Sequence, residues 1–311
     1  MASIMILGAA GFIGTNLALA LSKEENNILY LVDEDINYFN GYPLKECDNV
    51  HFCEVNYLSY NQMRTLISCV DIVYHLISTN NPTSSNESIE NDISENITIT
   101  TYILEACVKA NVKKIVFMSS GGAIYGRNVV CPIGEDDEKN PITTYGIQKL
   151  ALEKLLYLYN YLYGLDYVVI RLANPYGPYQ RPNGKLGVVS TFVHCAIHNE
   201  PLHVYGDGTV VRDYIYIEDA IRAILKIVNS KTNYRIYNIG SGVGTSVNEI
   251  IELIHNVIGH KLNVSYSEGR VVDVPVNYLN ISRYEKEYGK LYCRPLNEGI
   301  NKTIEFMSVR K

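Results

Sequence analysis

Tyr145 and Lys149 are the two residues whose types and spacing most directly suggest proton transfer. Four positions apart on a helix, they would share one face, where the ammonium can stabilise a phenolate. A free tyrosine titrates at about pH 10, so a tyrosine base needs a desolvated lysine and a further positive charge beside it. The chain holds 26 tyrosines, so a solvated helix face is the alternative interpretation of this spacing.

A glycine-rich segment near the start of the chain indicates dinucleotide binding. Gly8, Gly11 and Gly14 follow an apolar, strand-like run and precede a helix-like run. Glycines there allow a tight turn and close approach of backbone to a pyrophosphate, and the helix N-terminus favours negative charge. A plain strand-to-helix turn is the alternative, but Asp33 lies about 20 residues further on, where a carboxylate can bind the adenosine ribose and repel a 2′-phosphate. The sequence therefore predicts NAD rather than NADP.

The elements that would position these groups alternate between short apolar runs and longer helix-like segments. This pattern is typical of a parallel sheet covered by helices. Predicted strands are residues 4–7, 28–32, 50–54, 71–77, 114–118 and 167–172, and predicted helices are 12–22, 87–110 and 145–163. We expect an α/β protein with a Rossmann-type doubly wound sheet over residues 1–172 and a smaller α/β substrate-binding domain over 173–311, with segments around 210–245 returning to the first domain.

The composition excludes several classes of protein. A chain of 311 residues, 47% hydrophobic, can build a large core. Its net charge of −6 argues against nucleic-acid or anionic membrane surfaces as partners. No apolar run is long enough to span a bilayer, the first residues lack the basic segment of a secretory signal, and the cysteines lack paired spacing. We expect a cytoplasmic location.

Seven motifs occur in the order found in one known family: GAAGFIG, VYHL, KIVFMSSGGAIYG, TTYGIQK, RLANPYGP, YGDGTVVRDYIYIEDA and YNIGSG. The sequence thus resembles the extended short-chain dehydrogenase/reductases, in particular the nucleotide-sugar epimerase/dehydratase branch that includes UDP-glucose 4-epimerase. The resemblance implies Tyr145 as the base, Lys149 on the nicotinamide ribose, and a homodimer formed through the two long helices. The positions implied to contact NAD are Gly8, Gly11, Phe12, Ile13, Gly14, Asp33, Asn56, Leu76, Asn96, Ser119, Tyr145 and Lys149.

The same resemblance implies a nucleotide-sugar substrate. The implied substrate-binding positions are Asn174, Gly187, Val188, Arg212, Arg270, Asp273 and Asn277. Arg212 and Arg270 are expected around the diphosphate, because forked guanidinium donors match phosphate oxygens. For Arg212, a surface salt bridge with Asp213 is the alternative. Asn277 is smaller than the tyrosine that some members carry there, so we expect N-acetylated sugars to be accepted.

One departure from the family pattern concerns the hydroxyl that contacts the sugar. Many members carry it where this chain has Gly121. We expect Ser120 to substitute, because the flexible glycines beside it could turn its hydroxyl inward. Thr143, Thr144 or a water molecule are the alternatives.

A second departure concerns the reaction. Dehydratases of the branch carry an Asp-Glu pair where this chain has Gly122 and Ala123, so elimination lacks its acid and base. Decarboxylation is disfavoured because related enzymes keep an acid at the position of Ala123. These residues favour a 4-epimerase for a UDP-hexose or UDP-N-acetylhexosamine that passes through a 4-keto intermediate. An NAD(P)H-dependent nucleotide-4-keto-6-deoxysugar reductase and a non-catalytic NAD-binding regulator are the alternatives.

Three histidines and a cysteine suggest other chemistry. His194 and His198 share a helical face near Cys195, but no further ligand lies at suitable sequence spacing, so we predict a packing helix and no metal site. His75, at a predicted strand end, is either near the cofactor or a hydrogen-bonded core histidine.

Overall fold

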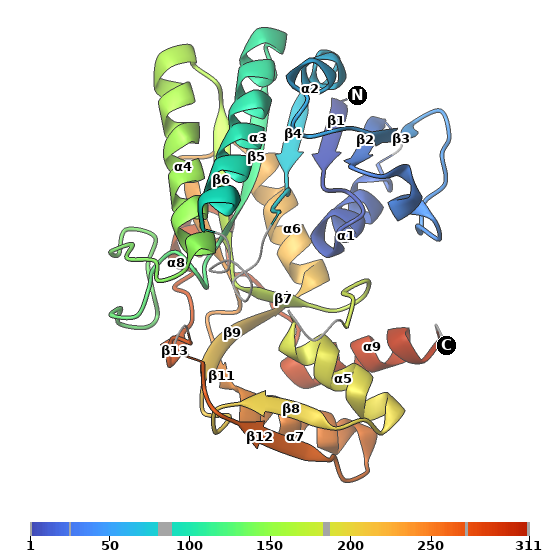
Figure 1. Ribbon diagram of the computed structural model, residues 1–311, viewed down its shortest axis with the longest axis vertical. Helices are drawn as coiled ribbons and strands as arrows, with labels where there is room; N and C mark the ends of the chain where they lie inside the picture. Colours follow the sequence, from blue (N-terminus) through green and yellow to red (C-terminus); the bar gives the residue numbers. More distant parts are fainter. Residues whose placement is uncertain (1, 25, 80–88, 183–186, 271–272, 310–311) are drawn as a thin grey trace. The chain divides into compact units, whose positions relative to one another are not determined.

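The computed structural model describes residues 2–24, 26–79, 89–182, 187–270 and 273–309 (Figure 1). Its strands are β1 (Ala2–Leu7), β2 (Asn27–Asp33), β3 (Val50–Glu54), β4 (Ile72–His75), β5 (Lys114–Ser120), β6 (Tyr167–Leu172), β7 (Asn174–Tyr176), β8 (Leu202–Tyr205), β9 (Val211–Tyr216), β10 (Ile236–Ile239), β11 (Gly244–Ser246), β12 (Val264–Ser267) and β13 (Val276–Asn277). Its helices are η1 (Ile36–Phe39), α1 (Phe12–Leu21), α2 (Tyr60–Ile67), α3 (Ile89–Ala110), α4 (Thr144–Tyr163), α5 (Val188–His198), α6 (Ile217–Val228), α7 (Val247–Ile258), α8 (Ser282–Tyr288) and α9 (Leu296–Val309).

The central feature is a seven-stranded sheet with the order β10-β6-β5-β4-β1-β2-β3. Strand β1 pairs in parallel with β2 and β4, β2 pairs in parallel with β3, and β4 pairs in parallel with β5. The strand order reverses direction at β1 and β4, as in doubly wound folds that bind dinucleotides. The predicted Rossmann-type fold class is confirmed.

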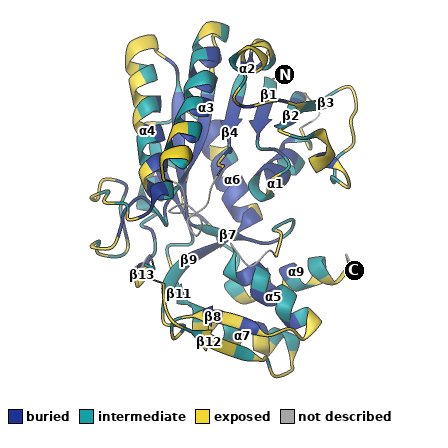
Figure 2. Cartoon of the chain, in the orientation of Figure 1, coloured by how far each residue is buried: buried dark blue, intermediate teal, exposed yellow. Residues whose placement is uncertain are grey.

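The side chains of β1 explain why its sequence is almost continuously apolar. Met5 and Leu7 belong to a buried cluster shared with α2, α3 and α4, whereas Ile4 and Ile6 are buried outside that cluster. Successive strand residues point to opposite faces, so both faces of the sheet are covered. Figure 1 shows α2, α3 and α4 as neighbours, and Figure 2 shows the strands beneath them as buried.

Most predicted elements lie where the sequence pattern placed them. The predicted strand 71–77 is the shorter β4, and the predicted helices 12–22 and 145–163 correspond to α1 and α4. The predicted helix 87–110 corresponds to α3 from Ile89 onwards, and residues 87–88 lie outside the described residues.

The chain divides into two compact units. The first comprises Met1–Ser119, Thr144–Ile170 and Thr232–Ile236, and the second comprises Ser120–Thr143, Arg171–Lys231 and Tyr237–Lys311. The sequence pattern placed 120–143 with the first domain, whereas these residues group with the second unit because their contacts are with it. From the predicted returning segment around 210–245, residues 232–236 group with the first unit.

The second unit is built around β9. This strand pairs with β7, β11 and β13, while β8 and β12 form a separate parallel pair. Helices α5, α7 and α9 share a buried apolar cluster with β8 and β9. Helix α7 begins with a capping box between Ser246 and Glu249 and ends at Gly259 in the left-handed conformation, so its ends are set by local sequence.

Within the described part of the chain, no helix combines the length and the apolar character needed to cross a membrane.

Candidate active site

The glycine-rich segment forms a close turn between β1 and α1. Gly8 has a φ of +83°, in the region that favours glycine. A Cβ atom at Gly14 would lie 2.4 Å from the Gly8 carbonyl oxygen and 2.8 Å from the Ala9 Cα, so only glycine fits there. Gly11 is the N-cap of α1, and Phe12 and Ile13 begin that helix. With no capping side chain at Gly11, the first N–H groups of α1 are suited to an anion, which is the fit expected for the pyrophosphate of NAD.

Asp33 lies beside this turn. Its Oδ2 accepts a hydrogen bond from the Ala10 backbone N–H at 2.9 Å, and its Oδ1 accepts one from the Glu34 N–H at 3.0 Å. The predicted ribose-binding carboxylate is therefore held against the glycine-rich turn by the backbone.

Tyr57 supports the same turn and was not identified from the sequence. Its hydroxyl accepts a hydrogen bond from the Gly8 N–H at 3.2 Å and lies 3.3 Å from the Val32 carbonyl oxygen, to which it donates. Burial raises the pKa of Tyr57, which keeps the hydroxyl protonated as a donor. One tyrosine among 26 carries no sequence signal for such a role.

Three other predicted NAD positions lie after strands or on α3. Asn56 follows β3, and its Oδ1 accepts a hydrogen bond from the Leu58 N–H at 2.9 Å. Leu76 follows β4, and its backbone N–H donates to the Leu7 carbonyl at 3.0 Å. Asn96 of α3 is buried and its amide donates to Thr79 Oγ1 at 2.7 Å. The side chains of Asn56 and Asn96 thus order the loops at the carboxyl ends of β3 and β4, where dinucleotides bind in such sheets.

Tyr145 and Lys149 share one face of α4, as predicted from their spacing. The Lys149 Nζ lies 5.6 Å from the Tyr145 ring centroid and donates a hydrogen bond to the Met118 carbonyl at 2.9 Å. Lys149 is only 4% exposed, whereas Tyr145 is half-buried. Burial lowers the pKa of Lys149 to about 8, and the Glu153 carboxylate acts in the opposite direction. The lysine is therefore still protonated at neutral pH and lies beside the phenol.

Glu153, one turn further along α4, was not identified from the sequence. It accepts a hydrogen bond of 2.6 Å from the Ser119 hydroxyl. Both side chains are buried, so this contact fixes the end of β5 against α4. Ser119, predicted to contact NAD, thus has its hydroxyl directed to a carboxylate of its own unit.

The residues around the missing hydroxyl lie in the second unit. Ser120 is half-buried at the end of β5, and the Gly121 N–H donates to the Leu172 carbonyl at 2.8 Å. A Cβ atom at Gly121 would lie 2.5 Å from Leu279 Cδ1 and 3.2 Å from the Arg171 carbonyl oxygen. Leu279 therefore occupies the space that a hydroxyl-bearing side chain at position 121 would need.

The predicted diphosphate arginines share one carboxylate. Arg270 forms hydrogen bonds of 3.1 and 3.2 Å with Asp273, and the Arg212 guanidinium lies 3.9 Å from the same carboxyl group. Arg212 also donates to the Val274 carbonyl at 2.5 Å. Two guanidiniums beside one carboxylate leave a net positive cluster, which suits a diphosphate. The alternative pairing of Arg212 with Asp213 is not formed, because the Asp213 carboxylate accepts hydrogen bonds from Ser241, Gly242 and Leu279 instead.

The remaining predicted substrate positions lie on β7, α5 and β13. Asn174 donates from its amide to the Asp213 carbonyl at 2.9 Å, and Asn277, 1% exposed, lies 3.4 Å from the Gly121 carbonyl oxygen. Gly187 is the N-cap of α5 with a φ of +80°, and Val188 is the first residue of that helix. A Cβ at Gly187 would lie 2.6 Å from the Gln180 amide nitrogen, a contact that no sequence pattern indicated.

His75, one of the histidines singled out in the sequence, lies in the buried core. His75 is 1% exposed, and its Nε2 forms a hydrogen bond of 2.9 Å with Thr100, so it is a hydrogen-bonded core histidine. Burial lowers the pKa of His75 to about 3, which keeps it neutral.

At the C-terminal end of α5, one nitrogen, sulfur or oxygen atom from each of His194, Cys195 and Glu200 lies within 4.8 Å of the others. Glu200, just after the helix, is a third candidate metal ligand that the sequence spacing did not indicate. Glu200 is brought back towards the helix by the left-handed C-cap at Asn199.

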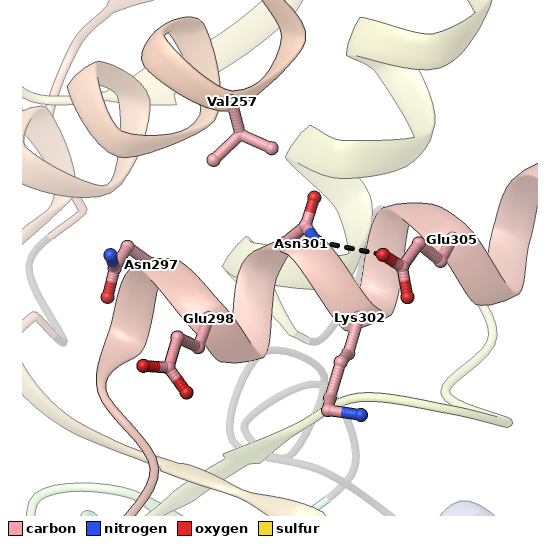
Figure 3. A pocket seen from close by; sticks show the side chains of 6 residues that line it. All are labelled: Val257, Asn297, Glu298, Asn301, Lys302 and Glu305. Carbon is pink, nitrogen blue, oxygen red and sulfur yellow. Dashed lines mark hydrogen bonds between the residues drawn. The ribbon is translucent and has the colours of Figure 1, made fainter.

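A surface pocket of about 440 Å³ lies on the second unit along α7 and α9 (Figure 3). Its lining residues are Val257, Asn297, Glu298, Asn301, Lys302 and Glu305. None of the residues predicted to bind NAD or substrate lines it, so this pocket is separate from the candidate site.

The seven-stranded sheet, the glycine-rich turn between β1 and α1, and the Tyr145–Lys149 pair define a dinucleotide-dependent enzyme of the extended short-chain dehydrogenase/reductase type. A sequence model of the NAD dependent epimerase/dehydratase family matches residues 4–240, and the chain belongs to this family. Its cofactor is NAD. The predicted family, enzyme class and cofactor are thereby confirmed.

Three named proteins illustrate what the chain is similar to. A crystal structure of UDP-glucose 4-epimerase with UDP-glucose from Thermotoga maritima is 33% identical, covers 99% of both chains and has a TM-score of 0.89. UDP-glucose 4-epimerase of Mycolicibacterium smegmatis is 30% identical, with 97% of each chain covered. The dTDP-4-dehydro-6-deoxyglucose reductase of Escherichia coli is 29% identical, with 97% of this chain and 96% of the reductase covered.

Proposed function

We propose that the protein is a nucleotide-sugar 4-epimerase acting on a UDP-hexose or UDP-N-acetylhexosamine, with Tyr145 as the base. The observation that carries this proposal is the buried Lys149 ammonium beside the Tyr145 ring on α4. The similarity to two UDP-glucose 4-epimerases supports the substrate class. In this proposal the first unit binds NAD and the second binds the nucleotide sugar.

The proposed proton transfer follows from the geometry of α4. Tyr145, as a phenolate stabilised by Lys149, accepts the proton of the sugar O4. It later returns this proton to the O4 of the epimeric product. The hydrogen bond from Lys149 to the Met118 carbonyl holds the ammonium in place. Bound NAD supplies the acceptor and then the donor of a hydride, so that the sugar is oxidised and re-reduced at C4 with no net redox change.

Binding of the diphosphate is assigned to Arg212 and Arg270. Asp273 contacts both guanidiniums and so orients them. An anchor at the diphosphate would retain a 4-keto sugar while the sugar ring turns over. Asn277 is included as the residue that leaves room for an N-acetyl group.

The proposal is tested by incubating the enzyme with UDP-glucose, UDP-N-acetylglucosamine and the corresponding dTDP sugars and following the anomeric protons by NMR. We expect epimerisation of a UDP sugar by the wild type and a loss of about 10²- to 10⁴-fold in Tyr145→Phe. Tyr161→Phe, a 77%-exposed tyrosine of the same helix, is the matched control. Full activity in Tyr145→Phe would rule out this mechanism, and a block against the acetylated sugar would rule out the role of Asn277.

The 4-ketoreductase remains the second candidate, because the Escherichia coli relative carries that name. A reductase would consume reduced cofactor with each turnover and exchange it with solution. An epimerase regenerates NAD and should retain it through purification. Measuring the cofactor content of the purified protein, and then the loss of reduced-nicotinamide absorbance with a 4-keto sugar, separates the two.

We also propose a homodimer that forms through α4. Three apolar residues of this helix, Leu158, Tyr161 and Leu162, are between 43% and 77% exposed. Their spacing places them on one stripe of the helix. Light scattering after size exclusion should give twice the chain mass for the wild type and a smaller mass for Leu158→Glu.

The seven cysteines are all free thiols, which supports the expected cytoplasmic location.

A further inference from the structure

Asp213 is a fully buried carboxylate in the middle of β9. Its Oδ1 accepts hydrogen bonds from the Ser241 N–H at 2.7 Å and from the Ser241 hydroxyl at 2.6 Å. Its Oδ2 accepts hydrogen bonds of 3.2 Å from the Gly242 N–H and from the Leu279 N–H. The exposed fraction of Asp213 is 0%, and burial raises its pKa. Such a group is tolerated only because donors surround it.

The surrounding backbone follows the outline of this carboxylate closely. A Cβ atom at Gly240 would lie 2.4 Å from Asp213 Oδ2 and 3.1 Å from the Ala173 Cβ. The segment 240–242 therefore wraps the carboxylate without space for a side chain at position 240. Two segments that are far apart in the chain, 240–242 and the one ending at Leu279, are thus tied to a single side chain.

The residues assigned to the nucleotide sugar meet at the same point. Asn174 donates its amide hydrogen to the Asp213 carbonyl at 2.9 Å. Arg212 precedes Asp213 on β9 and is paired in register with Asn277 of β13, two residues before Leu279. The main chain and carboxylate of Asp213 therefore contact or adjoin each of these three segments.

We propose that Asp213 is the positioning residue of the nucleotide-sugar site, fixing Asn174, Arg212 and the segment 277–279 relative to one another. This inference rests on the proposed function. Asp213 does not need to touch the substrate, because its main-chain carbonyl holds Asn174 and its carboxylate holds Leu279, two residues after Asn277. Its loss should therefore weaken the binding of a nucleotide sugar while leaving the binding of NAD intact.

The test compares Asp213→Asn with Ser241→Ala in the NAD-loaded enzyme. The asparagine keeps the size of the side chain but replaces one acceptor oxygen with an amino group that faces backbone donors. We expect the Kd for UDP, measured by calorimetry, and the KM for UDP-glucose to rise about tenfold or more, with a smaller change in kcat and unchanged NAD content. Ser241→Ala removes the hydroxyl that donates to the carboxylate and accepts from the Val243 N–H at 3.2 Å, leaves the carboxylate in place, and should raise both constants a few-fold.

Two control variants separate positioning from simple loss of stability. Asp207→Asn removes an exposed carboxylate that bonds only locally, to Thr209, just before β9, and should leave Kd and KM unchanged. Ile254→Val lowers stability through the apolar cluster of α7 and should lower the Tm without changing the Kd for UDP.

Three outcomes decide the matter. Wild-type Kd and KM in Asp213→Asn, or an equal rise in Ile254→Val, would overturn the inference while the proposed function stands. If Asp213→Asn does not fold, unchanged constants in Ser241→Ala overturn it instead. A wild-type enzyme that neither binds UDP nor interconverts UDP sugars would refute the proposed function, and this inference with it.

Discussion

The buried ammonium of Lys149 should make the stability of the protein depend on pH in a way that can be isolated. Burial lowers the pKa of Lys149 from its ordinary value of 10.5 to about 8. Because one pKa unit corresponds to about 1.4 kcal/mol, retaining the proton at neutral pH destabilises the folded state by about 3 kcal/mol. This unfavourable term is absent from a variant that has no proton at this position.

The direction of the effect follows from the two pKa values. Between pH 8 and 10.5 an unfolded chain keeps this proton while the folded chain loses it, so stability rises with pH through that window. The gain in stability is complete above pH 10.5, the pKa of Lys149 in the unfolded chain, and it is lost as the pH falls through about 8, the pKa in the folded chain. From pH 7 to pH 9.5 the free energy of unfolding of the wild type should therefore gain about 2 kcal/mol relative to Lys149→Met.

The assay is denaturant unfolding of the cofactor-free wild type and of Lys149→Met at a series of pH values. Methionine also removes the hydrogen bond to the Met118 carbonyl, but that loss is the same at every pH, so the slope of the difference is the readout. Lys154→Met, at an exposed position of the same helix, is the control and should give no slope. Parallel curves for the wild type and Lys149→Met would refute the reasoning, because they would mean that the ammonium is not desolvated.

Three further substitutions test the cofactor site and the second unit. Gly14→Ala would place a methyl group 2.4 Å from the Gly8 carbonyl, so we expect loss of bound NAD and a lower Tm; retention of NAD would contradict the close turn. Asp33→Asn removes the charge that repels a 2′-phosphate, so the ratio of the Kd values for NADP and NAD should fall, and an unchanged ratio would show that other groups select the cofactor. Gly121→Ser would clash with Leu279 and lower the free energy of unfolding by about 1–3 kcal/mol, and Leu279→Ala should recover part of that loss; melting curves that show no such recovery would mean that the strain lies elsewhere.

The features that the sequence predicted correctly are those governed by short-range spacing. The run Ile4 to Leu7 is apolar throughout because both faces of β1 are covered, and its pattern is visible in the sequence alone. The requirement for Gly14 comes from atoms only five and six residues away, in Ala9 and Gly8. The meeting of Tyr145 and Lys149 follows from the pitch of one helix.

The contacts that were missed join residues far apart in the chain. Tyr57 reaches Gly8 across 49 positions, and Leu279 fills the space beside Gly121 from a different segment of the second unit. Tyrosine and leucine are common core residues, so neither type signals a role by itself. The resemblance had placed Asp273 with Arg212 and Arg270, but the sequence did not show that this one carboxylate contacts both guanidiniums.

Lys149 in the first unit and Asp213 in the second are ionisable side chains whose burial disfavours the charged form, and both belong to the proposed chemistry. Lys149 is 4% exposed and bonds to a carbonyl, while Asp213 is 0% exposed and accepts four hydrogen bonds. Apolar residues of similar size would spare the desolvation of both charges, and stability alone would favour them. Their presence is explained if Lys149 must stabilise a phenolate and the Asp213 carboxylate must tie the segment 240–242 to Leu279, which no apolar side chain could do through hydrogen bonds. Apolar clusters around α3 and around α7 then supply the stability that these two charges reduce.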